Sequence, residues 1–317
     1  MRRFLPGIGL ALGALGITYG SLAYEVPRNF SFKEPYSSSE EVRVRFVGDI
    51  MLDRTIRTIV EKEGSDAIFG KINSFLQQAD FVVGNLEGPI TNFKSQSVGT
   101  RPGEAHNTRF TFDPSVAGIL ASLGFTVVAI GNNHIADFGQ EGIAQTKQHL
   151  AAVGIQPVGD PFSDSSEPVI EEVQGVVIAF AAYDEFILPD AEKTREAITR
   201  ASEAGADFVV VLAHWGNEYE SAPPPRVRTL AATFAAAGAH LIIGTHPHVI
   251  GEVEDIGSTR VYYSLGNFVF DQYWNESVRC GLAVSLTLTK VGTTTTASYI
   301  EQNVGLTRSG ATVLGCN

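Results

Sequence analysis

The residues best suited to chemistry in this 317-residue chain stand directly after short apolar runs. Single cases carry little weight, because an acid or amide after a strand usually serves as a turn or helix cap. Here five successive runs end in oxygen or imidazole donors, and loops after parallel strands commonly present ligand-binding side chains. We therefore expect them to meet at one edge of a sheet. The residues are Asp49, Glu87, Asn132, Asn133, His134, His214, His246 and His248.

His246-Pro247-His248 is the sharpest of these motifs. In an extended segment, residues i and i+2 point to the same side, and proline fixes φ. The motif therefore predicts two imidazoles held in parallel. The alternative is a surface loop with two incidental histidines.

The donor set combines carboxylate, amide and imidazole groups and contains no thiolate. Such a mixture suits Mn, Fe or Zn used for hydrolysis, rather than an all-sulfur structural zinc site. Two divalent ions about 3.5–4 Å apart, bridged by one carboxylate, would polarise a substrate oxygen and activate water near neutral pH. Two divalent metal ions are the expected cofactors.

The elements that must position these donors follow from the apolar patterns. Runs rich in Val, Ile and Phe alternate with helix-period segments, which predicts an α/β layered fold. From Cys280 the sequence alternates with period 2, as expected for an antiparallel hairpin or meander. The expected strands are 42–48, 80–85, 125–131, 176–183, 207–213, 239–244 and 261–270, and the expected helices are 53–62, 114–123, 139–152, 190–204 and 226–237. One domain spanning 42–317 is preferred.

The N-terminus has the pattern of an export signal. Two arginines precede an uncharged run from Phe4 to Tyr24, which is typical of a Sec-type signal. Residues 1–24 are either a cleaved signal peptide or a membrane anchor, since the run is also long enough to span a bilayer. Residues 25–41 form a polar linker, and everything after the apolar run is expected to be extracytoplasmic.

Charge and cysteine content narrow the possibilities further. The net charge of −12 argues against a nucleic-acid partner. Cys280 and Cys316 either form one disulfide or remain two unpaired thiols. The polar segment 91–109 is long enough for a functional loop and predicts a basic lip for an anion. Its basic residues are Lys94, Arg101 and Arg109.

Six motifs over about residues 44–275 together resemble one known family. In this order, they are similar to the CapA (PgsA) family of poly-γ-glutamate synthesis proteins, a branch of the calcineurin-like metallophosphoesterases. The resemblance implies a four-layer α/β/β/α sandwich with two mixed sheets packed between helices. The motifs are FVGDIML, VGNLEGPIT, IGNNHIADFG, AHWGNEY, GTHPHV and YSLGNFVFDQ.

The resemblance also implies roles for the metal ligands. Asp49 would bind the first metal, joined by His248, and Glu87 would take the place of the usual bridging aspartate. The second metal would be bound by Asn133, His214 and His246. The superfamily begins with Asp-x-His, but Met51 stands at the histidine position here, so single-metal occupancy is an alternative.

The remaining roles concern proton transfer and the substrate. His134 would be the general acid that protonates the leaving group. Asp137 would orient His134, or would instead form a capping box with Gln140 at the start of the next helix. Four more residues would line the substrate pocket, and for the last three of them hydrogen bonds that stabilise loops are the alternative. They are Asn85, Glu218, Asn267 and Asp271.

These features predict an extracytoplasmic metal-dependent enzyme of poly-γ-glutamate biosynthesis or processing, with hydrolytic or transfer chemistry. The first alternative is a general metallophosphoesterase. The second is a non-catalytic subunit that binds the polymer or a membrane synthase complex. The expected partners are poly-γ-glutamate or another anionic envelope substrate, and the membrane through the N-terminal segment, with no nucleic acid.

Overall fold

The computed structural model describes residues 40–316. The expected signal or anchor at 1–24 and most of the expected linker lie outside the described residues. The first described strand, β1 (Glu40–Ile50), begins within the last two residues of that linker. No helix of the described residues is long and apolar enough to cross a membrane.

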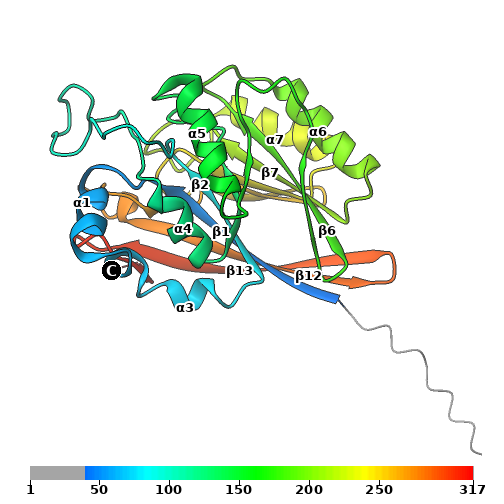
Figure 1. Cartoon of the computed structure of the whole chain (residues 1–317). Helices are drawn as coiled ribbons and strands as arrows, with labels where there is room; N and C mark the ends of the chain where they lie inside the picture. Colours follow the sequence, from blue (N-terminus) through cyan, green and yellow to red (C-terminus); the bar gives the residue numbers. More distant parts are fainter. Residues whose placement is uncertain (1–39, 317) are drawn as a thin grey trace, which may run out of the picture. The chain divides into compact units, whose positions relative to one another are not determined.

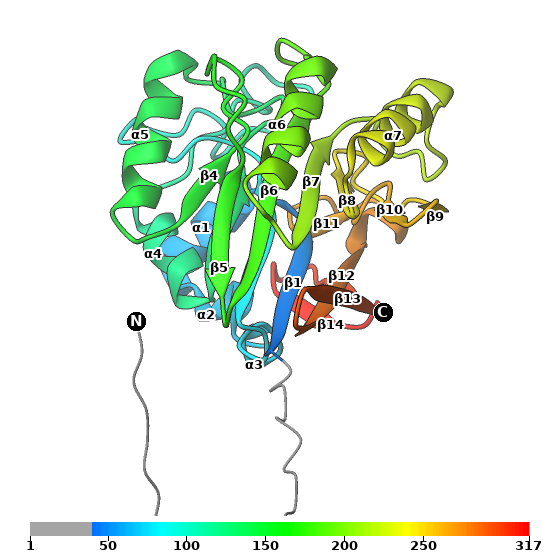
Figure 2. The ribbon, with the colours of Figure 1, turned by 90° about the vertical axis from the view of Figure 1, so that its right-hand side faces the viewer.

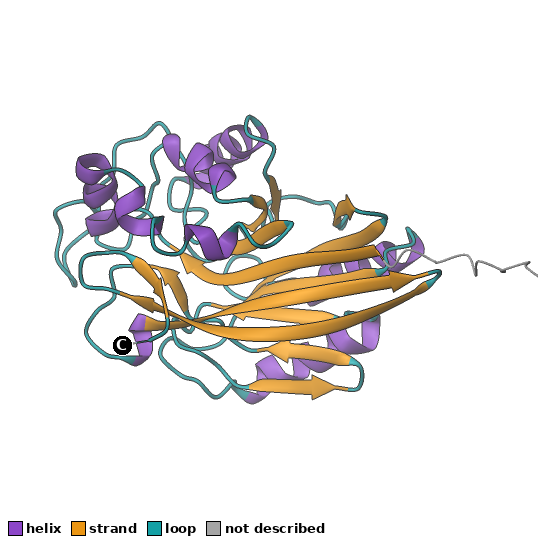
Figure 3. Ribbon diagram, turned by 90° about the horizontal axis from the view of Figure 1, so that it is seen from below, coloured by secondary structure: helices purple, strands orange, loops and turns teal. Residues whose placement is uncertain are grey.

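An eight-stranded mixed sheet contains three of the five strands whose ends carry the predicted donors (Figures 1 and 3). Its order is β14-β13-β12-β1-β2-β3-β4, and β11 pairs with β1. The neighbours from β1 to β4 are parallel, whereas β12, β13 and β14 are antiparallel. Besides β1, its strands are β2 (Phe81–Leu86), β3 (Phe125–Ala129), β4 (Gln156–Val158), β11 (Asn267–Val269), β12 (Cys280–Val291), β13 (Thr294–Leu306) and β14 (Thr312–Leu314).

A six-stranded mixed sheet packs against the first. Its order is β5-β6-β7-β8-β10-β9, with parallel pairs from β6 to β10 and antiparallel pairs at the two edges. The strands are β5 (Val169–Val173), β6 (Val176–Asp184), β7 (Phe208–His214), β8 (Leu241–Thr245), β9 (Val253–Ile256) and β10 (Thr259–Tyr262).

Helices cover the outer face of each sheet, and Figure 2 shows the two groups on either side. One group packs on the eight-stranded sheet through a core that includes Ile56, Leu120 and Val82. The other packs on the six-stranded sheet through a core that includes Ile198 and Phe234. The first group is α1 (Arg54–Glu63), α2 (Asp66–Phe69), α3 (Asn73–Leu76), α4 (Ser115–Ser122) and α5 (Gly139–Ala151), and the second is α6 (Ala191–Glu203) and α7 (Pro225–Ala237).

A third apolar core lies between the two sheets, so the fold has four layers. Successive residues of a strand face opposite sides of a sheet, and in β2 Val82 belongs to the outer core whereas Val83 belongs to the core between the sheets. Burial on both faces explains why the strands read as continuous apolar runs. The predicted α/β/β/α sandwich with two mixed sheets is confirmed.

The segment 261–270, expected to be one strand, is two. β10 belongs to the six-stranded sheet and β11 to the eight-stranded sheet, so the chain crosses between the sheets after Tyr262. Gly266 has φ +68°, and its carbonyl oxygen would lie 1.9 Å from a Cβ placed on Gly48. Two glycines therefore permit this close crossing beside the end of β1. The expected C-terminal hairpin is present as β12 and β13.

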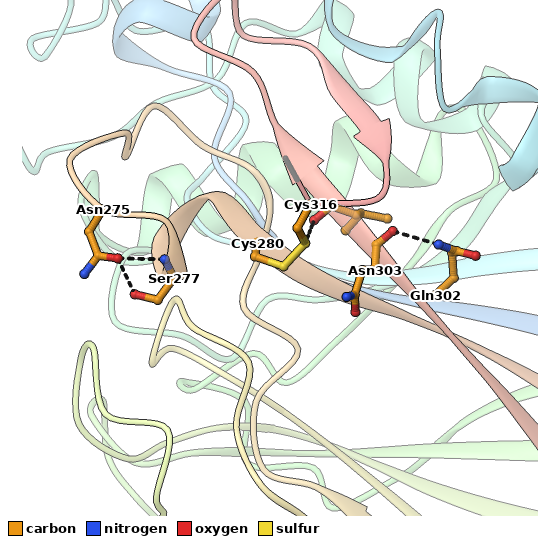
Figure 4. Close-up of a disulfide and its surroundings, with 7 residues drawn as sticks. Asn275, Ser277, Cys280, Gln302, Asn303 and Cys316 are labelled. Atoms are coloured by element: carbon orange, nitrogen blue, oxygen red, sulfur yellow. Dashed lines mark hydrogen bonds between the residues drawn. A yellow bond between two sulfur atoms is a disulfide. The ribbon is translucent and has the colours of Figure 1, made fainter.

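Cys280 and Cys316 form a disulfide, which decides between the two alternatives for these residues (Figure 4). Their Cα atoms are 5.4 Å apart, although the residues are separated by 36 positions in the sequence. Cys280 begins β12 and Cys316 follows β14. The bond ties the end of the described chain to the interior of the sheet.

Candidate metal centre

All the predicted ligands gather where the parallel strands of the two sheets end. Asp49 is the last but one residue of β1, and Glu87 follows β2 directly. From the other sheet, His214 is the last residue of β7. The remaining ligands come from the loops after β3 and β8, namely Asn133, His246 and His248.

Three of these side chains form a compact, fully buried cluster. Asp49, Glu87 and His248 each offer one ligand atom within 4.8 Å of the others. His248 Nδ1 lies 3.1 Å from Asp49 Oδ2, and His248 Nε2 lies 3.6 Å from Glu87 Oε1. Two carboxylates and one imidazole in this arrangement are a donor set that divalent cations prefer.

The hydrogen bonds of Asn267 fix the proton on His248. The Asn267 amide Nδ2 donates to Val278 O at 2.9 Å and to Gln272 Oε1 at 3.0 Å, so its Oδ1 must accept. That oxygen lies 3.0 Å from His248 Nδ1, which therefore carries the hydrogen. In the neutral imidazole, His248 Nε2 presents its lone pair to the Glu87 carboxylate, as required of a metal ligand.

The buried Glu87 carboxylate receives no hydrogen bond from the described residues. Both of its oxygens are buried and have no hydrogen-bond partner among the described residues. Burial raises the pKa of Glu87 well above its usual range, and the negative charge of Asp49 adds to this rise. A cation between the Glu87 carboxylate and the free lone pair of His248 would satisfy both groups. These residues therefore fit a divalent metal ion.

The other three predicted ligands form a second group beside the first. His214 Nε2 lies 2.9 Å from Asn133 Oδ1, and the rings of His214 and His246 are 4.9 Å apart. His246 Nδ1 is buried and has no partner within residues 40–316. Burial lowers the pKa of His214 and lowers that of His246 to about 4. Both imidazoles are therefore neutral near pH 7, the form that binds metals.

The backbone of the His-Pro-His motif differs from the expectation. β8 ends at Thr245, and His246 and His248 have φ values of 97° and 57°. The segment is therefore not extended, and the two rings are tilted by 47° rather than parallel. Positive φ is strained for a residue with a side chain and is concentrated at functional sites. This strained turn still brings both imidazoles into the site.

His134 lies at the rim of the cluster with Asp137 as its partner. His134 Nδ1 is 3.0 Å from Asp137 Oδ2, and the His134 ring lies 4.3 Å from that of Phe110. Asp137 also accepts a hydrogen bond from the Phe110 amide at 2.7 Å. α5 begins with Phe138 as its N-cap and has no side-chain cap. The structure thus contains the orienting contact, and the alternative capping box is absent.

Asn85 and Asn267, expected to line the substrate pocket, lie beneath the ligands instead. Asn85 Nδ2 donates to Asp49 Oδ1 at 2.8 Å and lies 3.3 Å from His214 Nδ1. Asn132 donates to Asn85 Oδ1 at 3.1 Å, which extends the network to the loop after β3. These contacts hold predicted ligands in place.

The other predicted pocket residues lie nearer the surface. Glu218 is exposed and its neighbour Tyr219 stacks toward His248, with ring centroids 6.1 Å apart. Asp271 pairs with Arg54. In the expected basic lip, Lys94 and Arg101 are exposed.

Arg109 of that lip binds the Asp137 backbone carbonyl at 2.9 Å. Met51, at the position of the missing histidine, is fully buried, and its sulfur accepts from the Asp53 amide at 3.1 Å.

Several residues near the site gave no signal in the sequence. Phe186 packs on His246 with ring centroids 4.2 Å apart, and it stands in a loop without any motif. Thr245 Oγ1 lies 2.9 Å from His214 Nδ1. In the sequence, only its position directly before His246-Pro247-His248 indicated that Thr245 lies at the site. Arg54 follows the first motif closely, but its sequence context is that of an ordinary helix start.

The four-layer sandwich and the buried carboxylate–histidine cluster at its strand ends define an α/β/β/α sandwich protein with a candidate divalent-metal site. The chain belongs to the family described as "Bacterial capsule synthesis protein PGA_cap", whose model matches residues 43–272. The family expected from the six motifs is thus confirmed.

Two named relatives agree with this assignment. The chain is 34% identical over 275 residues to the "PGA biosynthesis protein CapA" of Bacillus subtilis (strain 168), covering 81% of this chain and 70% of that protein. It is 31% identical over 261 residues to the "Capsule biosynthesis protein CapA" of Bacillus anthracis, covering 76% of this chain and 63% of that protein. The family's involvement in poly-glutamate capsule synthesis follows from these relatives.

Solved structures resemble the chain more distantly. A sulfate thiohydrolase SoxB of Thermus thermophilus, in complex with glycerol, aligns with a TM-score of 0.45 and 14% identity, covering 81% of this chain and 56% of that chain. The structure of the protein TT1561, also of Thermus thermophilus, aligns with a TM-score of 0.41 and 11% identity, covering 81% of this chain and 98% of that chain.

Proposed function

We propose that this protein is an extracytoplasmic, metal-dependent enzyme that cleaves or transfers poly-γ-glutamate during capsule synthesis. One observation carries the proposal: both oxygens of Glu87 are buried without a hydrogen-bond partner among the described residues, and Oε1 lies 3.6 Å from His248 Nε2. A folded protein retains such an arrangement at a cost in stability. The cost is offset when a cation occupies the site.

The residues divide into ligands and a proton donor. Asp49, Glu87 and His248 would hold one divalent ion, and Asn133, His214 and His246 would hold a second. A divalent ion at this position supplies a Lewis acid that polarises an oxygen of the substrate. His134 gives a proton to the leaving group, and its Nδ1 contact with Asp137 at 3.0 Å holds the ring so that Nε2 carries out the transfer.

The disulfide supports the proposed location. Structural disulfides persist in oxidising compartments and are rare in the cytosol. The bond between Cys280 and Cys316 therefore suits a protein exported by the segment at 1–24.

A non-catalytic role in binding the polymer or its synthase is the second candidate. The observation that favours it is Met51, which is buried at the place of a histidine ligand and is engaged with the Asp53 amide. The intact His134–Asp137 pair favours the enzyme, because a scaffold gains nothing from an oriented proton donor.

The test is an assay of the Mn²⁺-loaded and metal-free protein on poly-γ-glutamate and on a chromogenic phosphodiester. The proposal expects Mn²⁺-dependent cleavage or transfer of the polymer and loss of that activity in His134→Ala. Turnover of the phosphodiester alone identifies a general phosphoesterase. Polymer binding without turnover, unchanged in His134→Ala, identifies the non-catalytic role.

A further inference from the structure

Arg54 brings a mostly buried positive charge to the edge of the candidate metal centre. Its guanidinium carbon lies 5.0 Å from the ring centroid of Phe110 and 5.5 Å from that of Phe270. The same two rings contact the site: Phe110 lies 4.3 Å from His134, and Phe270 lies 4.9 Å from His248. Arg54 is therefore one aromatic ring away from both the proposed proton donor and a ligand candidate.

The guanidinium has more donors than the protein uses. An arginine offers five N–H groups. Nη2 donates to Asp271 Oδ1 at 2.5 Å, and Nη1 donates to Asn107 Oδ1 at 3.4 Å. Nε is buried and has no partner in the described part of the chain. The Arg54 side chain is only 14% exposed, so water can satisfy few of its free N–H donors. An unfilled donor on a buried cation indicates a missing acceptor.

The backbone is held in a strained conformation that directs this side chain. Arg54 has φ +51°, a value uncommon for residues other than glycine. Neighbouring bonds maintain it: Asp53 Oδ2 accepts from the Thr111 amide at 2.8 Å, and Asp271 Oδ2 accepts from the Thr55 amide at 3.3 Å. Strain of this kind is concentrated at ligand clamps. An ordinary helix start would not require it.

We infer that Arg54 binds the anionic group of the substrate, a carboxylate or a phosphate, next to the bond that reacts. The planar fork of arginine matches either anion with two parallel hydrogen bonds. The inference deepens the proposed function and rests on it, since it assigns substrate recognition at the same centre. The proposed anion contact is then Arg54, the first residue of α1, rather than the basic loop predicted at 91–109.

The experiment compares anion binding by Mn²⁺-loaded wild type and Arg54→Gln in isothermal titration calorimetry. Inorganic phosphate and glutarate are the two probes, so that the source of the anionic group is distinguished. We expect the Kd of at least one probe to rise about 10-fold or more, which corresponds to about 1.4 kcal/mol. Arg54→Lys keeps the charge but loses the fork, and it should give a smaller rise.

Arg57→Gln is the matched control. Arg57 lies on the same helix, its side chain is also 14% exposed, and its substitution removes the same charge. Its guanidinium is engaged by Glu61, Asp113 and the Thr111 carbonyl. We expect Arg57→Gln to bind both anions as the wild type does.

Each result bears on the inference in one direction. Weaker binding of phosphate only, of glutarate only or of both supports it and names the group. Unchanged binding of both anions by Arg54→Gln, equal weakening in Arg57→Gln, or no binding by the Mn²⁺-loaded wild type overturns it. If Arg54→Gln fails to show a wild-type thermal transition, Arg54→Lys decides. Failure of the proposed function is recognised separately, because the Mn²⁺-loaded wild type then binds the anions but neither cleaves nor transfers poly-γ-glutamate.

Discussion

Glu87→Gln is expected to change stability in opposite directions without and with a divalent cation. In the metal-free protein, both Glu87 oxygens are buried without a hydrogen-bond partner in the described part of the chain, and Asp49 adds like charge. A buried unsatisfied group costs about 1–3 kcal/mol, and more when it is charged. Glutamine keeps the length and removes the charge, but it leaves a buried amide. A net gain of about 1–2 kcal/mol is therefore expected, or a rise in Tm of about 2–4 °C.

Mn²⁺ should reverse this order. A ligand at 100 times its Kd stabilises the folded protein by about 2.7 kcal/mol. The wild type should gain this stabilisation, whereas Glu87→Gln should lose most of it because one carboxylate of the compact cluster is gone. The assay is thermal unfolding of both proteins in EDTA and in saturating Mn²⁺.

Glu185→Gln is the control for this experiment. The Glu185 carboxylate is 14% exposed, accepts from the Gly216 amide at 2.7 Å and pairs with Arg226. Its substitution should lower the Tm in EDTA and leave the response to Mn²⁺ intact. The reasoning is refuted if metal-free Glu87→Gln is less stable than the wild type and still shows the full Mn²⁺ shift.

Three further predictions concern catalysis, pH and the disulfide. His134→Ala should lower kcat about 10²–10⁴-fold with unchanged metal content. Asp137→Asn should lower kcat less and shift the pH profile of kcat. A wild-type kcat in His134→Ala would exclude His134 as the proton donor. Burial raises the pKa of Asp184 from 3.8 to about 6, so its contribution to stability is complete below pH ~4 and is lost as the pH rises through about 6, by about 3 kcal/mol in total. Urea unfolding at pH 4.5 and 7.5 should show this loss in the wild type and not in Asp184→Asn, and an equal pH response of the two proteins would contradict it. Replacing Cys280 and Cys316, 36 residues apart, by serine should cost about 2–4 kcal/mol, and identical urea midpoints for the double variant and the oxidised wild type would show that the bond adds no stability.

The apolar pattern predicted an α/β layered fold and the edge at which the donors meet, whereas the four layers were predicted by the resemblance to the CapA family. Runs such as β2 are apolar at every position because alternate residues, Val82 and Val83, face different cores. Parallel strands end at a common edge, so the polar residue after each run indicated the site without any knowledge of distances. The five longer helices begin and end within two residues of their expected bounds.

The sequence did not reveal features that depend on contacts between distant segments. The run 261–270 has the pattern of one strand, and only the close approach of Gly48 to Gly266 shows why it divides between two sheets. The positive φ of His246 and His248 is likewise imposed by the surroundings, since such values are uncommon for residues other than glycine. Asn85 and Asn267 stood in recognisable motifs, but a motif does not show whether a side chain faces the substrate or lies beneath the ligands.

Arg54 is the clearest case of a residue whose position depends on tertiary structure. Its place before a helical segment predicts a solvated first turn. Asp271, 217 positions further on in the sequence, fixes its guanidinium beside the centre. No local pattern contains that pairing.

The central claim is that the buried cluster of Asp49, Glu87 and His248 binds a divalent cation. The most direct test is a crystal structure of the Mn²⁺-soaked protein, with anomalous scattering recorded at the manganese edge. We expect an anomalous peak within metal-ligand distance of a Glu87 oxygen and of His248 Nε2. No peak at this cluster, with Mn²⁺ bound only elsewhere or not at all, would contradict it.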